Sequence, residues 1–177
     1  KNNYINEVDA KGNILAPGFI DIHTHFDPQL CWDGYATPSI EHGVTTVVTG
    51  NCSLSLAPIK NGGQDKIISM FQVIEDIKKP TFDAAVPFSW ETFGEYLDHI
   101  KPTLGINVGA LIGHSAVRLY VMGEDSQKRK ATDEEIKEMC DIVEKSMEDG
   151  ALGVSSSYVD VDENFDPVPS RFSCKKE

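Results

Sequence analysis

Short apolar runs alternate with segments of helical periodicity along this chain, and this alternation is the strongest constraint on its fold. Such runs are typical of strands buried on both faces, as in a parallel sheet covered by helices. They occupy 18–25, 44–52, 105–113 and 151–157 and are rich in Val, Ile and small residues. Strand and helix in alternation predict an α/β fold of right-handed βαβ units. A closed (β/α)8 barrel needs eight strands, so in a barrel these four would form about the first half.

The clearest helix is predicted over 132–147. Thr132 and Glu135 form a capping-box pattern at its start, and Gly150 follows its end. Its apolar positions recur at helical spacing: Ile136, Met139, Cys140, Val143 and Met147. This helix would lead directly into the fourth strand.

Two further helices and one loop are predicted around it. Ser89 caps the first of these helices, which ends near Pro102. Its apolar stripe is Trp90, Phe93, Leu97 and Ile100. The second runs over about 64–78, whereas the polar, proline-containing stretch 160–177 is expected to be a loop.

Composition excludes several classes of partner. The chain carries 28 acidic and 16 basic residues, and its net charge of −12 argues against nucleic-acid binding. Its apolar runs are far shorter than the roughly 20 residues of a membrane helix, so no membrane partner is expected. The cysteines are irregularly spaced with no CxxC pair, which favours a reducing, cytoplasmic setting over a disulfide framework. They are Cys31, Cys52, Cys140 and Cys174.

The first apolar run carries the chain's most informative chemistry. Side chains alternate along a strand, so one face would present Phe19, Asp21, His23 and His25. The opposite face would present Ile20, Ile22 and Thr24, and the isoleucines suit packing under helices. Strand geometry places the two imidazoles about 6–7 Å apart, close enough to converge on one divalent ion. Asp21 lies one step deeper, where it would fix a histidine tautomer or the neighbouring loop.

Two observations favour metal binding over a pair of hydrogen-bonded surface histidines. The pair ends a buried-type strand that begins after Ala16 and Pro17, and ligands gather at the carboxyl ends of parallel strands. Cys52 follows the second strand at the same edge. A packed thiol is an equally good explanation of Cys52 from its spacing alone. As a ligand beside two imidazoles, it would favour zinc over magnesium or calcium.

The third strand ends at His114 and Ser115, which places both at this edge as candidates for substrate contact. A hydrogen bond to the backbone is the simpler role for His114 and is favoured. Arg118 is a candidate partner for a substrate carboxylate, although an exposed or structural arginine is favoured. His42, in a short helix, and His99, on an amphipathic one, are expected to be surface residues.

Several of these segments resemble one known family. Segment 16–25, APGFIDIHTH, resembles the first barrel strand of the amidohydrolase superfamily. Segment 43–52, GVTTVVTGNC, followed by SLSLAP, is similar to the second strand of its N-acyl-D-amino-acid deacylase (D-aminoacylase) branch. GHS at 113–115 with Arg118 and VMG at 121–123, and GALGVSS at 150–156, are similar to that branch too. The resemblance covers nearly the whole chain after residue 11.

The resemblance implies a distorted TIM barrel flanked by a small β-sandwich. Residues 1–15 would be a remnant of the sandwich, and 16–177 would be the incomplete, N-terminal part of the barrel. It also implies one or two zinc ions, with His23 and His25 at one metal position and Cys52 at the more tightly held zinc. The implied reaction is deacylation of a small N-acyl-D-amino acid or related N-acyl compound by metal-activated water.

The resemblance also implies parts that this chain does not supply. The family takes two further histidines from its fifth and sixth strands and an acid/base aspartate from its eighth. We therefore expect residues 1–177 alone to be inactive and, with apolar strand edges unpaired, to self-associate.

Two alternatives remain open. Cyclic amidohydrolases, such as dihydroorotases and hydantoinases, typically use a carboxylated lysine from the fourth strand, and 151–157 contains no lysine. A non-catalytic truncated barrel fragment would bind no stoichiometric metal.

Overall fold

Within the part of the chain that the structure describes, four parallel strands form a sheet in the order β1-β2-β3-β4. The structure is a computed structural model and describes residues 8–177. Asp21 pairs with Val47, and Gly113 pairs with Ser155. The strands are β1 (Phe19–Asp21), β2 (Val44–Thr49), β3 (Asn107–Gly113) and β4 (Gly153–Ser155). The predicted α/β class and its four parallel strands are confirmed.

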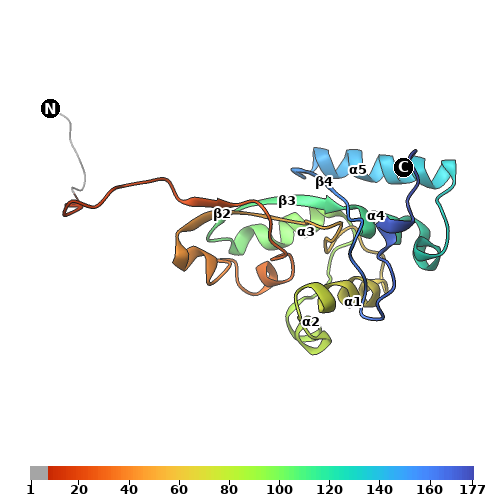
Figure 1. The fold of residues 1–177 in the computed structure, drawn as a ribbon, viewed down its shortest axis with the longest axis horizontal. Helices are drawn as coiled ribbons and strands as arrows, with labels where there is room; N and C mark the ends of the chain where they lie inside the picture. The colour runs from red at the N-terminus through yellow and green to blue at the C-terminus, as the bar shows by residue number, and fades with distance from the viewer. Residues whose placement is uncertain (1–7) are drawn as a thin grey trace.

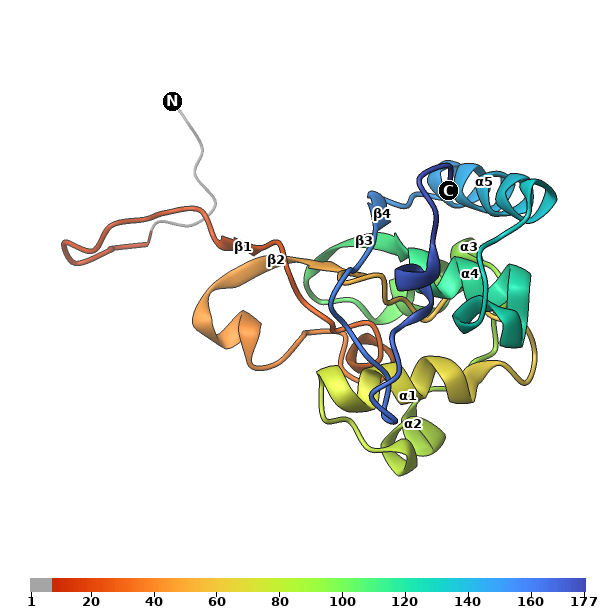
Figure 2. The same ribbon diagram turned by 45° about the vertical axis from the view of Figure 1, so that its right-hand side comes forward.

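Five α-helices accompany the sheet in the described residues. They are α1 (Gln64–Ile74), α2 (Lys79–Ala85), α3 (Phe93–Ile100), α4 (His114–Met122) and α5 (Asp133–Glu148). Short 3-10 helices are η1 (Gln29–Cys31), η2 (Ser39–His42), η3 (Lys101–Thr103), η4 (Gly123–Gln127) and η5 (Pro169–Phe172). Figures 1 and 2 show these elements gathered around β2 and β3, while residues 8–18 extend away from them.

The apolar core joins the two central strands to the helices. Its fully buried members include Val47 of β2, Ile112 of β3 and Phe71 of α1, together with aromatic residues of α2 and α3. Burial of such side chains contributes roughly 1.5–3 kcal/mol each. This packing anchors the end of β2, which together with β1 carries the candidate site.

Strand β1 corrects one expectation. The predicted strand 18–25 is regular only over Phe19–Asp21. The isoleucine face was expected to pack under helices, but Ile20 and Ile22 are 63% and 73% exposed. The reason is that β1 forms one edge of the sheet, and none of the described helices covers this face. Thr24 is buried, and its backbone still bonds to Val48 at 3.0 Å.

The helix predictions hold with two corrections. The capping box of Thr132 and Glu135 is present at the start of α5. The cap of α3 is Thr92, with a capping box to Glu95, whereas Ser89 was expected. Trp90 precedes that helix, and its indole N–H donates a hydrogen bond to the Leu56 carbonyl at 2.9 Å.

The segment 64–78 is also shorter as a helix than expected. Helix α1 ends at Ile74, and Asp76 has a positive φ of 52°. A second helix, α2, begins at Lys79 with a proline in its first turn, a position where proline stabilises helix entry.

The two ends of the chain differ. Residues 160–177 were expected to form a loop; they contain η5 and an isolated bridge between Val161 and Pro167, and Val168 is fully buried. At the other end, residues 1–7 of the expected sandwich remnant lie outside the described residues, and 8–15 form no strand. The remnant stays a prediction. None of the described helices is both long and apolar enough to span a membrane.

Candidate metal centre

Three metal-ligating side chains meet beyond the carboxyl ends of β1 and β2. The ligand atoms of His23, His25 and Cys52 all lie within 4.8 Å of one another. His23 Nε2 is 3.2 Å from Cys52 Sγ, and the two imidazole rings lie edge to face with centroids 5.4 Å apart. The structure thus brings together the three residues predicted as metal ligands. No other such group of His, Cys, Asp or Glu occurs among the described residues.

The donor set fits a zinc ion. Two imidazoles and one thiolate are common zinc ligands, and nitrogen and sulfur ligands of a tetrahedral site lie roughly 3.4–3.6 Å apart. The separation between His23 and Cys52 is close to that value. His25 Nδ1 is buried with no hydrogen-bond partner, and an unpaired buried polar atom costs about 1–3 kcal/mol. A cation bound through Nδ1 would remove that cost.

Electrostatics acts differently on the two partly buried candidate ligands, His25 and Cys52. Burial, and then the neighbouring His23, lower the pKa of His25, which favours the neutral imidazole that ligates metals. Burial raises the pKa of the Cys52 thiol, and the charges of Asp160 and Glu75 raise it further. The site therefore disfavours a bare thiolate, and a bound cation would reverse that preference.

Cys52 lies on a sharp turn that we call the Cys52 turn, residues 50–53. Gly50, Cys52 and Ser53 have positive φ angles of 75°, 54° and 65°. A Cβ added to Gly50 would lie 1.9 Å from the Leu111 carbonyl oxygen, so only glycine fits where the turn presses on β3. The spacing of the sequence gave no sign of this close approach.

Two polar side chains tie the Cys52 turn to residues 21–27, which we call the histidine segment. Asp27 is buried, and its Oδ2 accepts a hydrogen bond from the Gly50 N–H at 3.0 Å. Burial raises the pKa of Asp27 to about 7. Asn51 donates its side-chain amide to the carbonyls of Thr24, at 3.2 Å, and Val48, at 3.0 Å. Since Thr24 stands between the two histidines, Asn51 couples their backbone to the turn that carries Cys52.

Asp21 contacts the backbone of the segment that carries the two histidines. Its Oδ1 accepts a hydrogen bond from the His23 N–H at 3.2 Å. Of the two roles proposed for it, this contact matches fixing the neighbouring loop. Within residues 8–177, no imidazole donates a hydrogen bond to Asp21.

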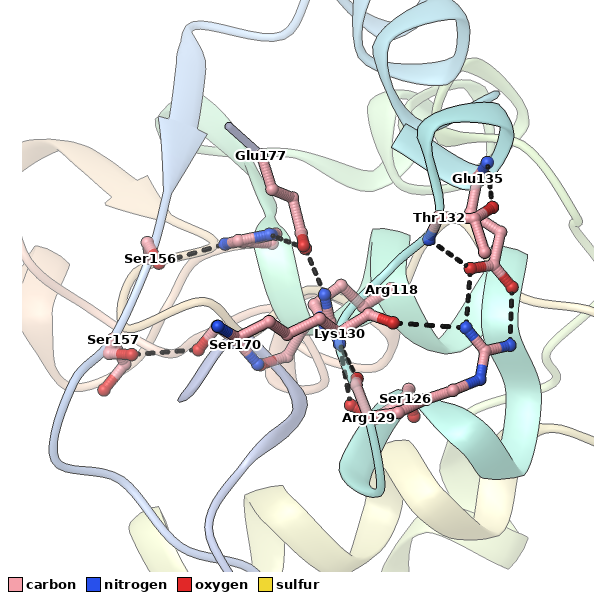
Figure 3. Close-up of polar contacts among 12 residues, drawn as sticks. Arg118, Ser126, Arg129, Lys130, Thr132, Glu135, Ser156, Ser157, Ser170 and Glu177 are labelled. Carbon is pink, nitrogen blue, oxygen red and sulfur yellow. Dashed lines mark hydrogen bonds and ion pairs between the residues drawn. The ribbon is translucent and has the colours of Figure 1, made fainter. Parts of the chain in front are cut away.

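The three candidate substrate-binding residues lie on the first turns of α4, where Arg118 belongs to a polar network with Glu177 (Figure 3). His114 contacts Ser156 Oγ at 3.1 Å and Glu177 Oε1 at 2.9 Å, so its ring bonds to side chains instead of the favoured backbone. Ser115 is buried, and its hydroxyl is 2.8 Å from that of Ser53. A role of this network in substrate binding stays a prediction.

Arg118 is structural in this network. It is fully buried, pairs with the Glu177 carboxylate, and donates to the carbonyls of Ser126 and Arg129 at 3.1 and 3.0 Å. The alternative of an exposed arginine is therefore wrong. Three of its five N–H donors are occupied by these contacts, and its buried Nε has no partner.

The remaining two histidines lie on other elements. His42 is exposed on η2, as expected. His99 is only half exposed, because its ring packs on Trp90 with centroids 4.9 Å apart.

Asp160 is a charged residue near the site that the sequence did not reveal. It follows β4 in the stretch expected to be a polar loop, and its charge raises the pKa of both His25 and Cys52, in each case as a smaller effect than burial. Its Oδ2 is buried without a hydrogen-bond partner. Nothing in the DVDEN segment distinguishes this aspartate from its acidic neighbours.

Comparison with protein families matches residues 6–166 to a family described as Amidohydrolase family. A D-aminoacylase of Alcaligenes xylosoxydans xylosoxydans is 40% identical over 150 residues, which is 84% of this chain and 28% of the relative. An N-acyl-D-aspartate deacylase of the same organism is 37% identical over the same shares. The chain thus spans about 28% of the length of these curated relatives.

Comparison with solved structures finds proteins of similar fold. A D-aminoacylase crystal structure matches with a TM-score of 0.66 and 32% identity, over 90% of this chain and 30% of the other. An N-acyl-D-glutamate deacylase from Bordetella bronchiseptica, complexed with zinc and a phosphonate inhibitor, matches with a TM-score of 0.58 and 28% identity, over 80% and 27%. A further D-aminoacylase structure concerns a binuclear metal centre. These matches confirm the predicted first half of a TIM-like barrel.

Proposed function

Because this chain belongs to the amidohydrolase family, we propose that the full-length protein is a zinc-dependent hydrolase of linear amides that deacylates N-acyl-D-amino acids or related N-acyl compounds. The observation that carries the proposal is the convergence of His23, His25 and Cys52. When bound, zinc supplies Lewis acidity toward a substrate carbonyl and toward water. One or two ions are compatible with these three donors.

Residues of this chain have defined tasks in the proposal. His23, His25 and Cys52 hold the metal, and the lowered pKa of His25 keeps that imidazole in its ligating form. Asp21 fixes the backbone of His23. We assign the general acid/base to an aspartate outside residues 1–177, and we therefore propose that these residues alone are inactive.

The substrate class rests on the relatives. Those named above are a D-aminoacylase and deacylases of N-acyl-D-aspartate and N-acyl-D-glutamate, which supports a small N-acyl amino acid as the substrate. The four free cysteines support the cytoplasmic setting that we propose. Against a cyclic amidohydrolase, β4 and its flanks carry no lysine that could be carboxylated.

The test uses the full-length protein. We expect stoichiometric zinc by elemental analysis, and chelator-sensitive release of free amino acid from N-acetyl-D-amino acids in preference to their L-enantiomers. Stoichiometric metal with hydrolysis of dihydroorotate or hydantoins instead would favour the cyclic alternative. Absence of both metal and hydrolysis would favour the non-catalytic fragment.

A further inference from the structure

The Cys52 turn needs support from outside itself. Three of its four residues have positive φ, and each non-glycine residue in that region costs roughly 1–2 kcal/mol. Cys52 and Ser53 are both of this kind. The backbone that aims the Cys52 thiol is therefore held by its surroundings.

A single hydroxyl from strand β4 bridges the two ends of this turn. Ser155 Oγ donates a hydrogen bond to the Gly50 carbonyl and accepts one from the Ser53 N–H at 3.0 Å. The two bonded groups flank Asn51 and Cys52. Ser155 thus closes the turn from a residue more than a hundred positions away in the sequence.

Glycine at position 113 makes this reach possible. Ser155 is paired with Gly113 in the sheet, and β3 separates β4 from the strand that carries the turn. A Cβ added to Gly113 would lie 2.4 Å from the Ser53 carbonyl oxygen. Because no side chain stands there, the turn lies against the end of β3 and within reach of Ser155.

We propose that Ser155 is a positioning residue that fixes the Cys52 thiol for metal binding by closing the Cys52 turn. This inference rests on the proposed function, since it assumes that Cys52 ligates the metal. Ser155 itself contacts no ligand atom. It acts through the backbone on both sides of Cys52.

Other contacts keep the turn in place when the hydroxyl is removed. Asp27 still accepts from the Gly50 N–H, and the Ser53 carbonyl still accepts from the Ser115 N–H at 3.0 Å. Loss of Ser155 would therefore leave the fold intact while freeing the Gly50 carbonyl and the Ser53 N–H. The local conformation of Cys52 would then relax from the position that suits the metal.

The experiment measures metal binding in the full-length protein. Zinc affinity is determined by competition with a chromophoric chelator, and the bond to sulfur is followed by the thiolate-to-metal charge-transfer absorption of the cobalt-substituted protein. For Ser155→Ala we expect about a tenfold loss of zinc affinity, at the lower end of the 10–100-fold range typical of residues that support a ligand, with a weaker charge-transfer band. Ser146→Ala is the matched control, because the Ser146 hydroxyl bonds within α5, to the Ile142 carbonyl.

A second pair of variants separates positioning from general destabilisation. Ser155→Thr and Ser155→Val have nearly the same shape and differ in the hydroxyl, so Thr should keep the affinity and Val should lose it. Equal affinity and equal cobalt spectra for this pair would overturn the inference, as would an equal loss in Ser146→Ala. A wild-type protein that binds no zinc would instead overturn the proposed function on which the inference rests.

Discussion

The histidine segment and the Cys52 turn supply the same site but are held in different ways. The histidines follow a short edge strand, with His23 and Ile22 exposed. Cys52 lies on a turn pressed against β3 and closed by polar side chains from two other segments. The position of Cys52 is therefore fixed by contacts with several parts of the fold, whereas the two histidines take their support mainly from β2. Four substitutions test how far that contrast extends.

The largest effect is expected from Cys52→Ala. Losing one of three ligands should exceed the loss of up to about 100-fold seen for supporting residues, so we expect about 1,000-fold weaker zinc binding, or about 4 kcal/mol. Cys140→Ala is the control, since Cys140 is exposed on α5. Chelator competition measures both, and a change below threefold in Cys52→Ala would place the metal elsewhere.

Gly50→Ala tests whether the Cys52 turn is rigid. The new Cβ would meet the Leu111 carbonyl oxygen at 1.9 Å with φ at 75°, so we expect the free energy of unfolding to fall by about 3 kcal/mol. Gly62→Ala is matched in φ, at 85°, but has no atom within 4 Å. Gly62→Ala should lower the free energy of unfolding by about 1 kcal/mol. Equal midpoints of Gly50→Ala and Gly62→Ala in chemical denaturation would mean that the Cys52 turn accommodates the added Cβ at little cost in stability.

Asn51→Asp breaks the connection between the two regions. The substitution keeps the shape of the side chain but removes the N–H donors to Thr24 and Val48. We expect a loss of about 2 kcal/mol in the free energy of unfolding and about tenfold in zinc affinity. The exposed Asn61→Asp is the control and should change stability by less than about 0.5 kcal/mol. Unchanged zinc affinity in Asn51→Asp would show that the two regions act independently.

These positions also show what sequence could and could not predict. The parallel strands and the meeting of His23, His25 and Cys52 follow from local patterns, because strand alternation and the common edge of a parallel sheet place them. The cap of α3 was visible in principle as Thr92 and Glu95, the same pattern that predicted the start of α5. The predicted cap, Ser89, lies three residues before Thr92.

Most of the features that the sequence did not predict depend on contacts between residues far apart in the chain. The bonds of Ser155 to the Cys52 turn join residues 102 and 105 positions apart, and no local periodicity encodes them. The exposure of Ile20 and Ile22 depends on which elements cover an edge strand, which alternation alone does not specify. Asp160 likewise follows β4, far in sequence from His25 and Cys52, whose pKa values its charge raises.

The smallest effect, from His25→Leu, tests the histidine side without metal. His25 Nδ1 is buried and unpaired, so replacing the ring by an apolar side chain should raise the free energy of unfolding of the metal-free protein by about 1 kcal/mol. The exposed His23→Leu should change it by less than about 0.5 kcal/mol. Both variants should bind zinc more weakly. Only in His25→Leu should this loss of zinc affinity accompany a gain in the stability of the metal-free protein. Thermal unfolding in the presence of chelator measures the first effect. If the metal-free His25→Leu protein were destabilised, His25 would contribute to the stability of the fold without metal. The histidine segment and the Cys52 turn would then differ less in how they are held.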